Sequence, residues 1–262
     1  MTETLRDHLW LWCHLPGVYN RIQALDGESD FTPVEAAVYL NIRNLIMVVY
    51  GGKPVPPFAP LQKKFLPFDR VVWSLIGDGG SKHQDPTADL REVLDLHRQF
   101  PNVVGGIMDD FMPRSDTFAL ADISSRMRAE KLPLWVVVYA HELDRPDLRE
   151  KLELCDVIAF WTWDAKDLEK LPENLARLKA IAPHQQIALG CYLWNFGGPT
   201  ALTVEHMQFQ CELGLQFWRE QTINEMIILG SPLVGMNLPT IDWTRDWIRQ
   251  NRDSMTAPRR HS

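Results

Sequence analysis

Two adjacent acidic residues, Asp109 and Asp110, come directly after the apolar run Val103–Met108. Side chains alternate along a strand, so one acid of such a pair is expected to face inward and the other away. Carboxyl groups held at the end of a strand can act as general acids, bases or nucleophiles. The pair is predicted to be catalytic, with a helix cap or turn as the alternative. Which of the two acids faces the site stays open.

Glu142 is the best second carboxyl group, because it follows the next apolar run, Leu134–Tyr139. Neighbouring strands lie about 4.8 Å apart. Acids on two such strands can approach the roughly 5–5.5 Å separation of a retaining glycosidase. Asp164, one run further on, suits the larger separation of an inverting enzyme or the cap of a helix. Asp78 lies between glycines and fits a turn as well as a ligand contact.

Aromatic, amide and imidazole side chains end several of the same runs. Flat rings stack on the C–H faces of sugars, whereas amides and carboxylates bind hydroxyl groups. Large rings also fill space beneath helices, so part of this set is expected in the core. The predicted substrate-binding residues are His14, Tyr50, Asp78, Tyr139, His141, Trp163, Asp164, Tyr192, Trp194 and Asn195.

Eight short apolar runs, rich in β-branched and aromatic residues, predict the strands that must position these side chains. They are Leu9–His14, Leu45–Tyr50, Val71–Ile76, Val103–Met108, Leu134–Tyr139, Val157–Trp163, Ile187–Trp194 and Met226–Leu229.

Segments with helical spacing lie between the runs: Asp89–Phe100, Thr117–Lys131, Pro146–Leu154, Asp167–Ile181, Thr203–Thr222 and Asp242–Asn251. Gly51–Phe68 is rich in proline, so the second helix should be short or irregular. Tyr19–Ile42 is long enough for an extra helix or a lid.

Strand and helix alternate strictly, which favours a parallel sheet covered by helices. Eight repeats without a flexible linker favour one α/β domain, a (β/α)8 TIM barrel over residues 1–251, with a flexible tail over 252–262. An open, doubly wound sheet is the alternative. In a barrel the active site lies at the C-terminal ends of the strands, where the predicted polar and aromatic residues are.

The chain of 262 residues carries a formal net charge of -7 and has no long cluster of basic residues. Nucleic-acid binding is therefore not expected. No run of 18 apolar residues predicts a membrane span. Four widely spaced cysteines and a polar start without a signal peptide make the cytoplasm the default location, with secretion left open.

Cofactor and metal motifs are weak in this sequence. His14 and His141 are single histidines without HxH or HExxH spacing, so neither a metal nor a cofactor is predicted. Gly197-Gly198 is a weak signal for phosphate. No lysine ends a late strand, which counts against a Schiff-base enzyme. A small molecule or an oligosaccharide is the expected partner, and the oligomeric state is open.

The run Gly105–Phe111 (GGIMDDF), together with Tyr192–Gly197 (YLWNFG), resembles glycoside hydrolases with TIM-barrel folds. The resemblance implies acids after the fourth strand and late aromatic residues that frame a sugar. It assigns no particular family. The chitinase pattern D-x-x-D-x-D-x-E is absent, since Val103 and Gly106 occupy positions of its first two acids.

The sequence thus predicts hydrolysis of a glycosidic bond by Asp110 or Asp109 together with Glu142. Two alternatives remain. One is a metal-dependent lyase, isomerase or amidase that uses His14, Asp109, His141 and Glu142. The other is a barrel that binds a carbohydrate without turnover.

Overall fold

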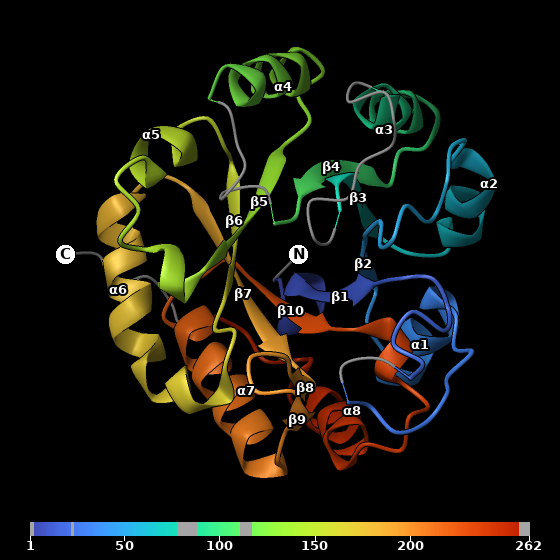
Figure 1. The fold of residues 1–262 in the computed structure, drawn as a ribbon, viewed down its shortest axis with the longest axis vertical. Helices are drawn as coiled ribbons and strands as arrows, with labels where there is room; N and C mark the ends of the chain where they lie inside the picture. The colour runs from blue at the N-terminus through green and yellow to red at the C-terminus, as the bar shows by residue number, and fades with distance from the viewer. Residues whose placement is uncertain (1–2, 22–23, 78–87, 111–116, 257–262) are drawn as a thin grey trace.

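The strands close into a ring in the computed structural model, which describes residues 3–21, 24–77, 88–110 and 117–256. Neighbouring strands around the ring are parallel and follow the order β1-β10-β7-β6-β5-β4-β3-β2 (Figure 1). The predicted TIM barrel is confirmed, and the alternative prediction of an open, doubly wound sheet is wrong. The strands are β1 Leu9–Cys13, β2 Asn44–Met47, β3 Arg70–Ile76, β4 Val103–Met108, β5 Leu134–Tyr139, β6 Val157–Trp161, β7 Gln186–Tyr192 and β10 Glu225–Leu229.

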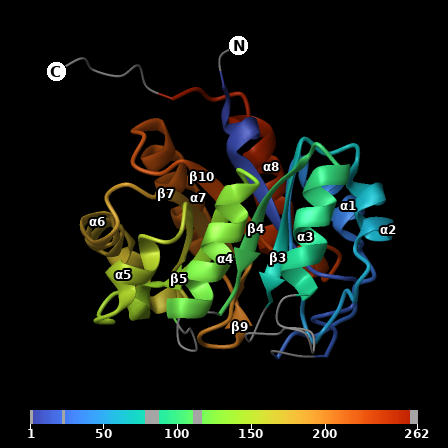
Figure 2. The ribbon, with the colours of Figure 1, turned by 90° about the horizontal axis from the view of Figure 1, so that it is seen from above.

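Helices surround the ring on its outside, as Figures 1 and 2 show. Those in the described residues are α1 Pro33–Leu40, α2 Ala59–Gln62, α3 Ala88–Gln99, α4 Thr117–Ala129, α5 Leu148–Leu152, α6 Leu171–Ile181, α7 Val204–Arg219 and α8 Pro239–Asn251. The proline-rich segment does hold only a short helix, α2, which the 3-10 turn η2, Lys63–Phe65, extends. None of the described helices combines the length and apolar composition needed to cross a bilayer.

The long segment after β1 contains α1, as its length suggested. Thr32 begins this helix with a capping box. Its hydroxyl accepts from the Glu35 N–H at 3.2 Å, and the Glu35 carboxylate accepts from the Thr32 N–H at 2.8 Å. The reciprocal bonds satisfy two backbone donors at the start of the helix. Pro33 occupies the first helical position, where its missing N–H costs nothing.

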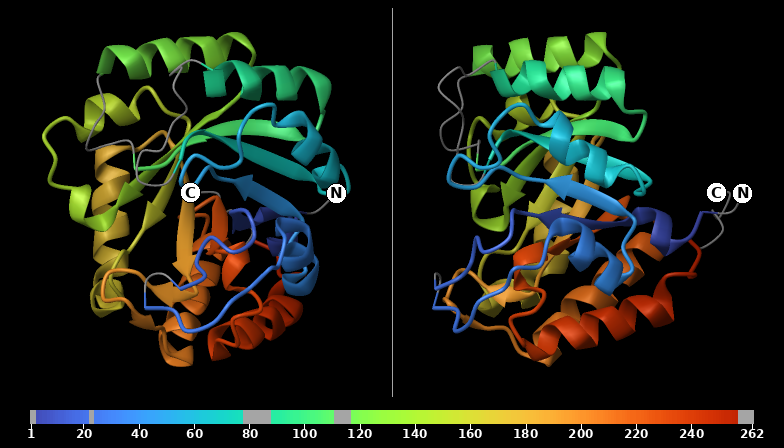
Figure 3. Two further views of the ribbon diagram at one scale, coloured as in Figure 1. Left: turned by 45° about the vertical axis from the view of Figure 1, so that its right-hand side comes forward. Right: turned by 90° about the vertical axis from the view of Figure 1, so that its right-hand side faces the viewer.

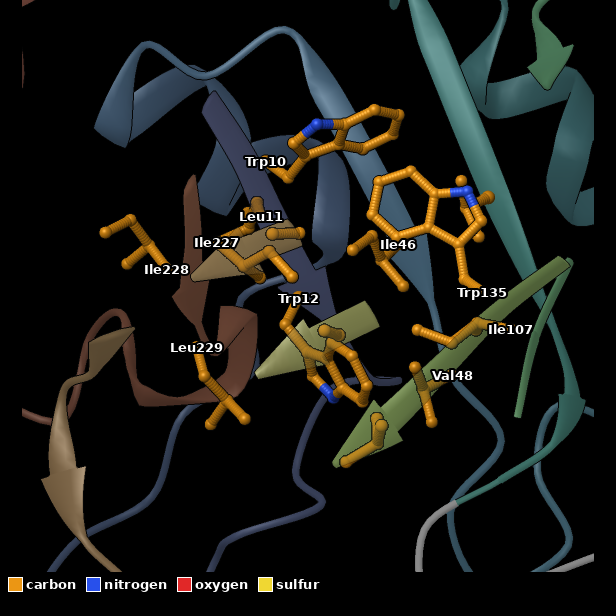
Figure 4. Packing of buried hydrophobic residues seen from close by; sticks show 14 of the residues in the cluster. Trp10, Leu11, Trp12, Ile46, Val48, Ile107, Trp135, Ile227, Ile228 and Leu229 are labelled. Carbon is orange, nitrogen blue, oxygen red and sulfur yellow. The ribbon is translucent and has the colours of Figure 1, made fainter. Parts of the chain in front are cut away.

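Two pairs of tryptophans lie in the interior of the barrel. Trp10 meets Trp135 edge to face at 5.1 Å (Figure 4). Closer to the C-terminal ends of the strands, Trp12 meets Trp161 at 5.4 Å. Glycines make room for the larger rings. A Cβ built on Gly190 would lie 2.0 Å from the Trp161 ring. Rings and glycines are thus complementary across the barrel, which is a packed core rather than a channel.

The N-terminal end of the barrel is closed by a polar cluster around Glu225. Its carboxylate accepts from Trp10 Nε1 at 2.8 Å and pairs with Arg70 at 3.2 Å and with His8 at 3.4 Å. The Arg70 guanidinium also lies over the Trp10 ring, and Asn44 accepts from Arg70 Nε at 3.2 Å. We call these five residues the basal cluster. It pairs the buried Glu225 carboxylate with two partly exposed cations, as burial of a charge requires.

The described segments next to the two termini lie at the same end of the barrel, as the right view of Figure 3 shows. Thr4 forms a β-bridge with Met255, and Arg6 pairs with Asp253 at 2.8 Å. The segment from residue 252, expected as a flexible tail, therefore begins with contacts to the N-terminal turn η1, Leu5–His8. Residues 257–262 lie outside the described part.

Candidate active site at the barrel mouth

Alternation along the strands decides which side chains reach the mouth, by which we mean the C-terminal ends of the eight barrel strands. Trp10 and Trp12 point into the barrel, whereas Leu11 between them points away (Figure 4). The next residue in phase on β1 is His14. In the same way Ile107 points inward on β4, and Asp109 is the next residue in phase. Asp109 is therefore the inward member of the acidic pair, and it is buried.

Asp110 reaches the mouth by a different route. Its backbone adopts a left-handed conformation with φ of 47°, which costs an ordinary side chain energy but which Asp and Asn tolerate. The Asp110 N–H donates to Asp109 Oδ1 at 2.9 Å, and Asp110 Oδ1 accepts from the Tyr139 hydroxyl at 2.7 Å. Both acids thus lie beside Tyr139, and the left-handed turn places two adjacent residues on the same side.

Tyr139 links the acids to the neighbouring strand, β5. Burial raises the pKa of its hydroxyl well above the usual value, and the charges of Asp109, Tyr192 and Asp110 raise it further. The hydroxyl therefore stays protonated and remains a hydrogen-bond donor to Asp110. It orients that carboxylate and cannot itself act as a base.

Glu142 is buried in the 3-10 turn η5, Ala140–Glu142, immediately after β5. Its Oε2 accepts from the Tyr139 N–H at 2.9 Å, which is a capping contact. Burial raises the pKa of Glu142, and the charge of Asp110 adds to the increase, although the Tyr139 N–H acts in the opposite direction. Glu142 and Asp110 thus follow neighbouring strands and lie within electrostatic reach of each other, one at the backbone N–H and the other at the hydroxyl of Tyr139.

Two of the predicted residues are engaged in turns instead. Asp164 caps the 3-10 helix η6, Ala165–Lys170, through the Lys166 N–H at 3.2 Å, and pairs with Lys166 Nζ at 2.7 Å. Its pKa is lowered by those contacts, the side-chain bond to Lys166 first. Asn195 Oδ1 accepts from the Ala165 N–H at 3.0 Å. Both side chains therefore make capping contacts at the start of η6.

Aromatic rings form a continuous arc around the mouth. Starting on the β2 side, Tyr50 contacts His14 at 5.7 Å, and His14 contacts Tyr19 at 5.4 Å. Tyr19 contacts Phe196 at 5.6 Å, and Phe196 contacts Trp163 at 5.8 Å. The arc is completed by Tyr192, Tyr139 and His141, which follow through further ring contacts. It ends beside the two acids, so apolar faces and carboxyl groups adjoin.

Tyr19 and Phe196 were not among the predicted site residues. Both lie in loops after a strand, and both are buried at the centre of the arc. Phe196 precedes Gly197-Gly198, and a Cβ on Gly197 would lie 2.6 Å from Asp164 Cβ and 2.9 Å from the Trp163 ring. Gly197 therefore serves close packing against Trp163, whereas Gly198 lies against Asn195. An aromatic residue beside a glycine pair is the signal that would have identified Phe196.

Trp194 does not join the arc. β7 ends at Tyr192, and Trp194–Asn195 form a second short strand, β8, paired antiparallel with β9, Thr200–Ala201. The predicted strand Ile187–Trp194 was therefore too long. Trp194 is buried and lines a small cavity of about 10 Å³ with Leu168, Leu202 and Gln210. Trp163 and Tyr192 of the arc line the same cavity, so Trp194 lies between the arc and the residues around α7.

The two strand-end histidines do not converge. β1 and β5 lie four strands apart in a ring of eight, so His14 and His141 are on opposite sides of the mouth. His14 is buried, and burial lowers its pKa to about 3. His141 is exposed and stacks parallel to Tyr139 at 5.4 Å. Among the described residues no three His, Cys, Asp or Glu side chains form a metal-binding group. Asp78 lies outside the described residues.

Comparison with solved structures finds the same barrel in distant proteins. A candidate alpha-L-fucosidase from Bacteroides thetaiotaomicron aligns with a TM-score of 0.59 and 11% identity over 95% of this chain and 98% of the other. The PgaB (BpsB) glycoside hydrolase domain from Bordetella bronchiseptica gives 0.55 and 10% over 95% and 99%. A tryptophan synthase alpha-subunit mutant from Pyrococcus furiosus gives 0.55 and 14% over 95% and 98%.

These identities establish the fold and not an activity, because one barrel hosts many chemistries. No protein-family model matches the chain, and no curated relative matches it. The chain is similar to glycoside hydrolases, and to other enzymes, in having the TIM-barrel fold.

Proposed function

We propose that this protein hydrolyses a glycosidic bond at the barrel mouth. The observation that carries the proposal is the position of Asp110, held by the Tyr139 hydroxyl in a left-handed turn at the end of the aromatic arc. Backbone strain at a buried polar cluster is typical of functional sites. Rings beside carboxyl groups match the two faces of a sugar, one of C–H groups and one of hydroxyls. Two of the structural neighbours carry the names of glycoside-cleaving proteins.

Glu142 is the proton donor in this proposal. Burial raises its pKa, which favours the protonated form that a general acid needs. Its proton goes to the glycosidic oxygen as the bond from that oxygen to the anomeric carbon breaks. Asp110 acts on the anomeric carbon from the neighbouring strand, directly or through a water molecule. Water finally adds its hydroxyl to that carbon, and its remaining proton restores Glu142 or leaves through Asp110.

Asp109 and Tyr139 position Asp110. Asp109 accepts from the Asp110 N–H, which fixes the left-handed turn, and Tyr139 fixes the carboxylate. No metal or cofactor is part of this proposal. A metal-dependent reaction that uses both His14 and His141 is disfavoured by their places on opposite sides of the ring.

The test is the substitution Asp110→Asn, assayed on a panel of oligosaccharides and aryl glycosides. Asn tolerates the left-handed conformation, so the variant removes the charge and keeps the turn. Its kcat should fall by about 10²–10⁴-fold. Asp164→Asn is the matched control, since that carboxylate already caps η6 and pairs with Lys166, and its kcat should stay within about threefold of the wild type. Full activity in Asp110→Asn, or no glycan cleaved by the wild type, would overturn the proposal.

A further inference from the structure

His14 is held firmly at the end of β1. Its backbone N–H donates to the Ser231 hydroxyl at 3.1 Å, and that hydroxyl donates to the His14 carbonyl at 3.1 Å. The imidazole Nδ1 lies 3.2 Å from the Tyr19 hydroxyl. Ring and main chain are therefore both fixed, and the direction of the second ring nitrogen is set by these contacts.

The second nitrogen, Nε2, is buried and has no hydrogen-bond partner in the described part of the protein. His14 as a whole is only 1% exposed. Leaving a buried polar group unpaired typically destabilises a fold, and native structures contain few such groups. An unpaired nitrogen on a fixed ring at the mouth of a barrel therefore points to a ligand.

The chemistry of Nε2 limits what that ligand can be. The imidazole is neutral throughout the working pH range, because burial lowers its pKa to about 3. If the Tyr19 hydroxyl donates to Nδ1, Nε2 carries the proton and donates. If Nδ1 donates to Tyr19, Nε2 accepts. A hydroxyl group satisfies either tautomer, since it can both donate and accept. An anion fits only the first tautomer, and a cation fits only the second.

The surroundings of His14 favour an uncharged ligand with an apolar face. Tyr19 and Tyr50 lie edge to face against the imidazole. Tyr50 is only half-buried, so its ring borders solvent beside the imidazole. β1 lies three strands from β4 around the ring, so His14 is well separated from Asp110.

We propose that His14 Nε2 binds one hydroxyl group of a neutral sugar and so fixes the orientation of that sugar across the mouth. The inference rests on the proposed function in taking the mouth as a carbohydrate site. It adds a specificity-determining residue that touches the substrate away from the reacting bond. Loss of this bond should raise KM more than it lowers kcat.

Two variants test the role of the nitrogen. His14→Phe keeps a flat ring and removes both nitrogens, whereas the amide of His14→Gln can place a hydrogen-bonding group near the position of Nε2. On the glycan that the wild type cleaves, the Phe variant should raise KM by about tenfold, the worth of one hydrogen bond, with kcat within about threefold. The Gln variant should recover part of the loss. His184→Phe, an exposed histidine at the other end of the barrel, is the control.

A double-mutant cycle identifies the hydroxyl. The monosaccharide that the enzyme releases is prepared in monodeoxy forms, each lacking one hydroxyl, and the affinity of each is measured. One deoxy form should bind about tenfold more weakly to the wild type and no more weakly to His14→Phe. Equal losses on both proteins for every deoxy form would overturn the inference, while the hydrolytic function would stand.

A measurement on the wild-type protein avoids the possibility that a His14 variant fails to fold. In ¹⁵N-histidine-labelled wild type, the Nε2 signal of His14 is followed during titration with glucose, galactose, fucose and N-acetylglucosamine, with His184 as internal reference. A shift of His14 alone with one of these sugars supports the inference, even where no glycan is cleaved and the proposed hydrolysis fails. No shift with any of them overturns it.

Discussion

At the N-terminal end of the barrel, Glu225 binds Trp10, Arg70 and His8, whereas at the mouth His14 keeps one nitrogen without a protein partner. In the basal cluster the Glu225 carboxylate contacts three side chains, although His8 Nδ1, 3.4 Å from it, forms an ion-pair contact without hydrogen-bond geometry. The mouth holds its polar groups in fixed positions, in a left-handed turn or against aromatic rings. Groups of the same kinds thus close the barrel at one end and, in the function we propose, face a ligand at the other, at the C-terminal face where TIM barrels have their active sites.

Two buried glutamates give the largest test of this contrast. Glu142 at the mouth and Glu225 in the basal cluster are 4% and 6% exposed, so the same change to Gln can be compared directly. Glu225→Gln should lower the free energy of unfolding by about 3 kcal/mol, because Arg70 and His8 lose their buried counter-charge. Activity per folded molecule should not change.

Glu142→Gln should behave in the opposite way. Its kcat should fall by about 10²–10⁴-fold. The amide oxygen can still accept from the Tyr139 N–H, and burial no longer opposes a charge, so the free energy of unfolding should hold or rise. Urea unfolding and initial rates on the same preparations separate the two outcomes. Equal losses of stability in both variants would mean that Glu142, like Glu225, serves to stabilise the fold, and would contradict the contrast between the two ends of the barrel.

The alternation of apolar and polar residues was enough to predict the barrel, its helices and the inward position of an acid after β4. It left open which acid that was, because a strand boundary that slips by one residue exchanges the two faces. It also could not supply the left-handed turn at Asp110, which returns the second acid to the same side. That conformation is accompanied by hydrogen bonds to Tyr139 and Asp109. Such contacts form in the folded protein and cannot be read from the alternation of apolar and polar residues.

The same reasoning explains Trp194 and Tyr19. Extending β7 by two residues placed Trp194 in phase with the mouth, but the chain leaves the barrel after Tyr192 and Trp194 begins a separate short strand, β8. Tyr19 lies five residues after His14, in the loop that follows β1. Hydrophobic periodicity does not predict the path of that loop. The path of a loop that returns over a barrel mouth is determined by side-chain packing. Hydrophobic periodicity therefore could not predict the residues of the aromatic arc that lie in such loops.

A pH experiment uses two histidines that flank β1. The Glu225 contacts outweigh the opposing effect of burial and raise the pKa of His8, whereas burial lowers that of His14. His8 therefore contributes stability that is present below its unfolded value and is lost as the pH rises through its folded one. For His14 the unfolded chain binds more protons, so stability is lost as the pH falls below about 6.5.

Replacing His14 with Gln should thus remove up to about 1.4 kcal/mol per pH unit of the stability loss between about pH 6 and 4. Replacing His8 with Gln should leave that acid loss in place and remove the stabilisation gained on protonation. Urea midpoints at half-unit pH steps measure both slopes against the wild type. Parallel curves for His14→Gln and the wild type would contradict a neutral, buried imidazole at the mouth.

The smallest effect compares two exposed rings of similar accessibility. Trp163 in the arc is 39% exposed, and Phe209 on the outer face of α7 is 42% exposed. Each is half in solvent, so truncation to Ala should change the free energy of unfolding by no more than about 1 kcal/mol in either case.

Trp163 stands edge to face with both Tyr139 and Tyr192, next to the acids, and so offers a sugar a flat surface close to Asp110. Trp163→Ala should raise KM by about fivefold to tenfold, equivalent to about 1 kcal/mol of lost stacking, while Phe209→Ala leaves KM unchanged. Equal KM values in the two variants would show that exposure, and not position in the arc, is all that distinguishes Trp163.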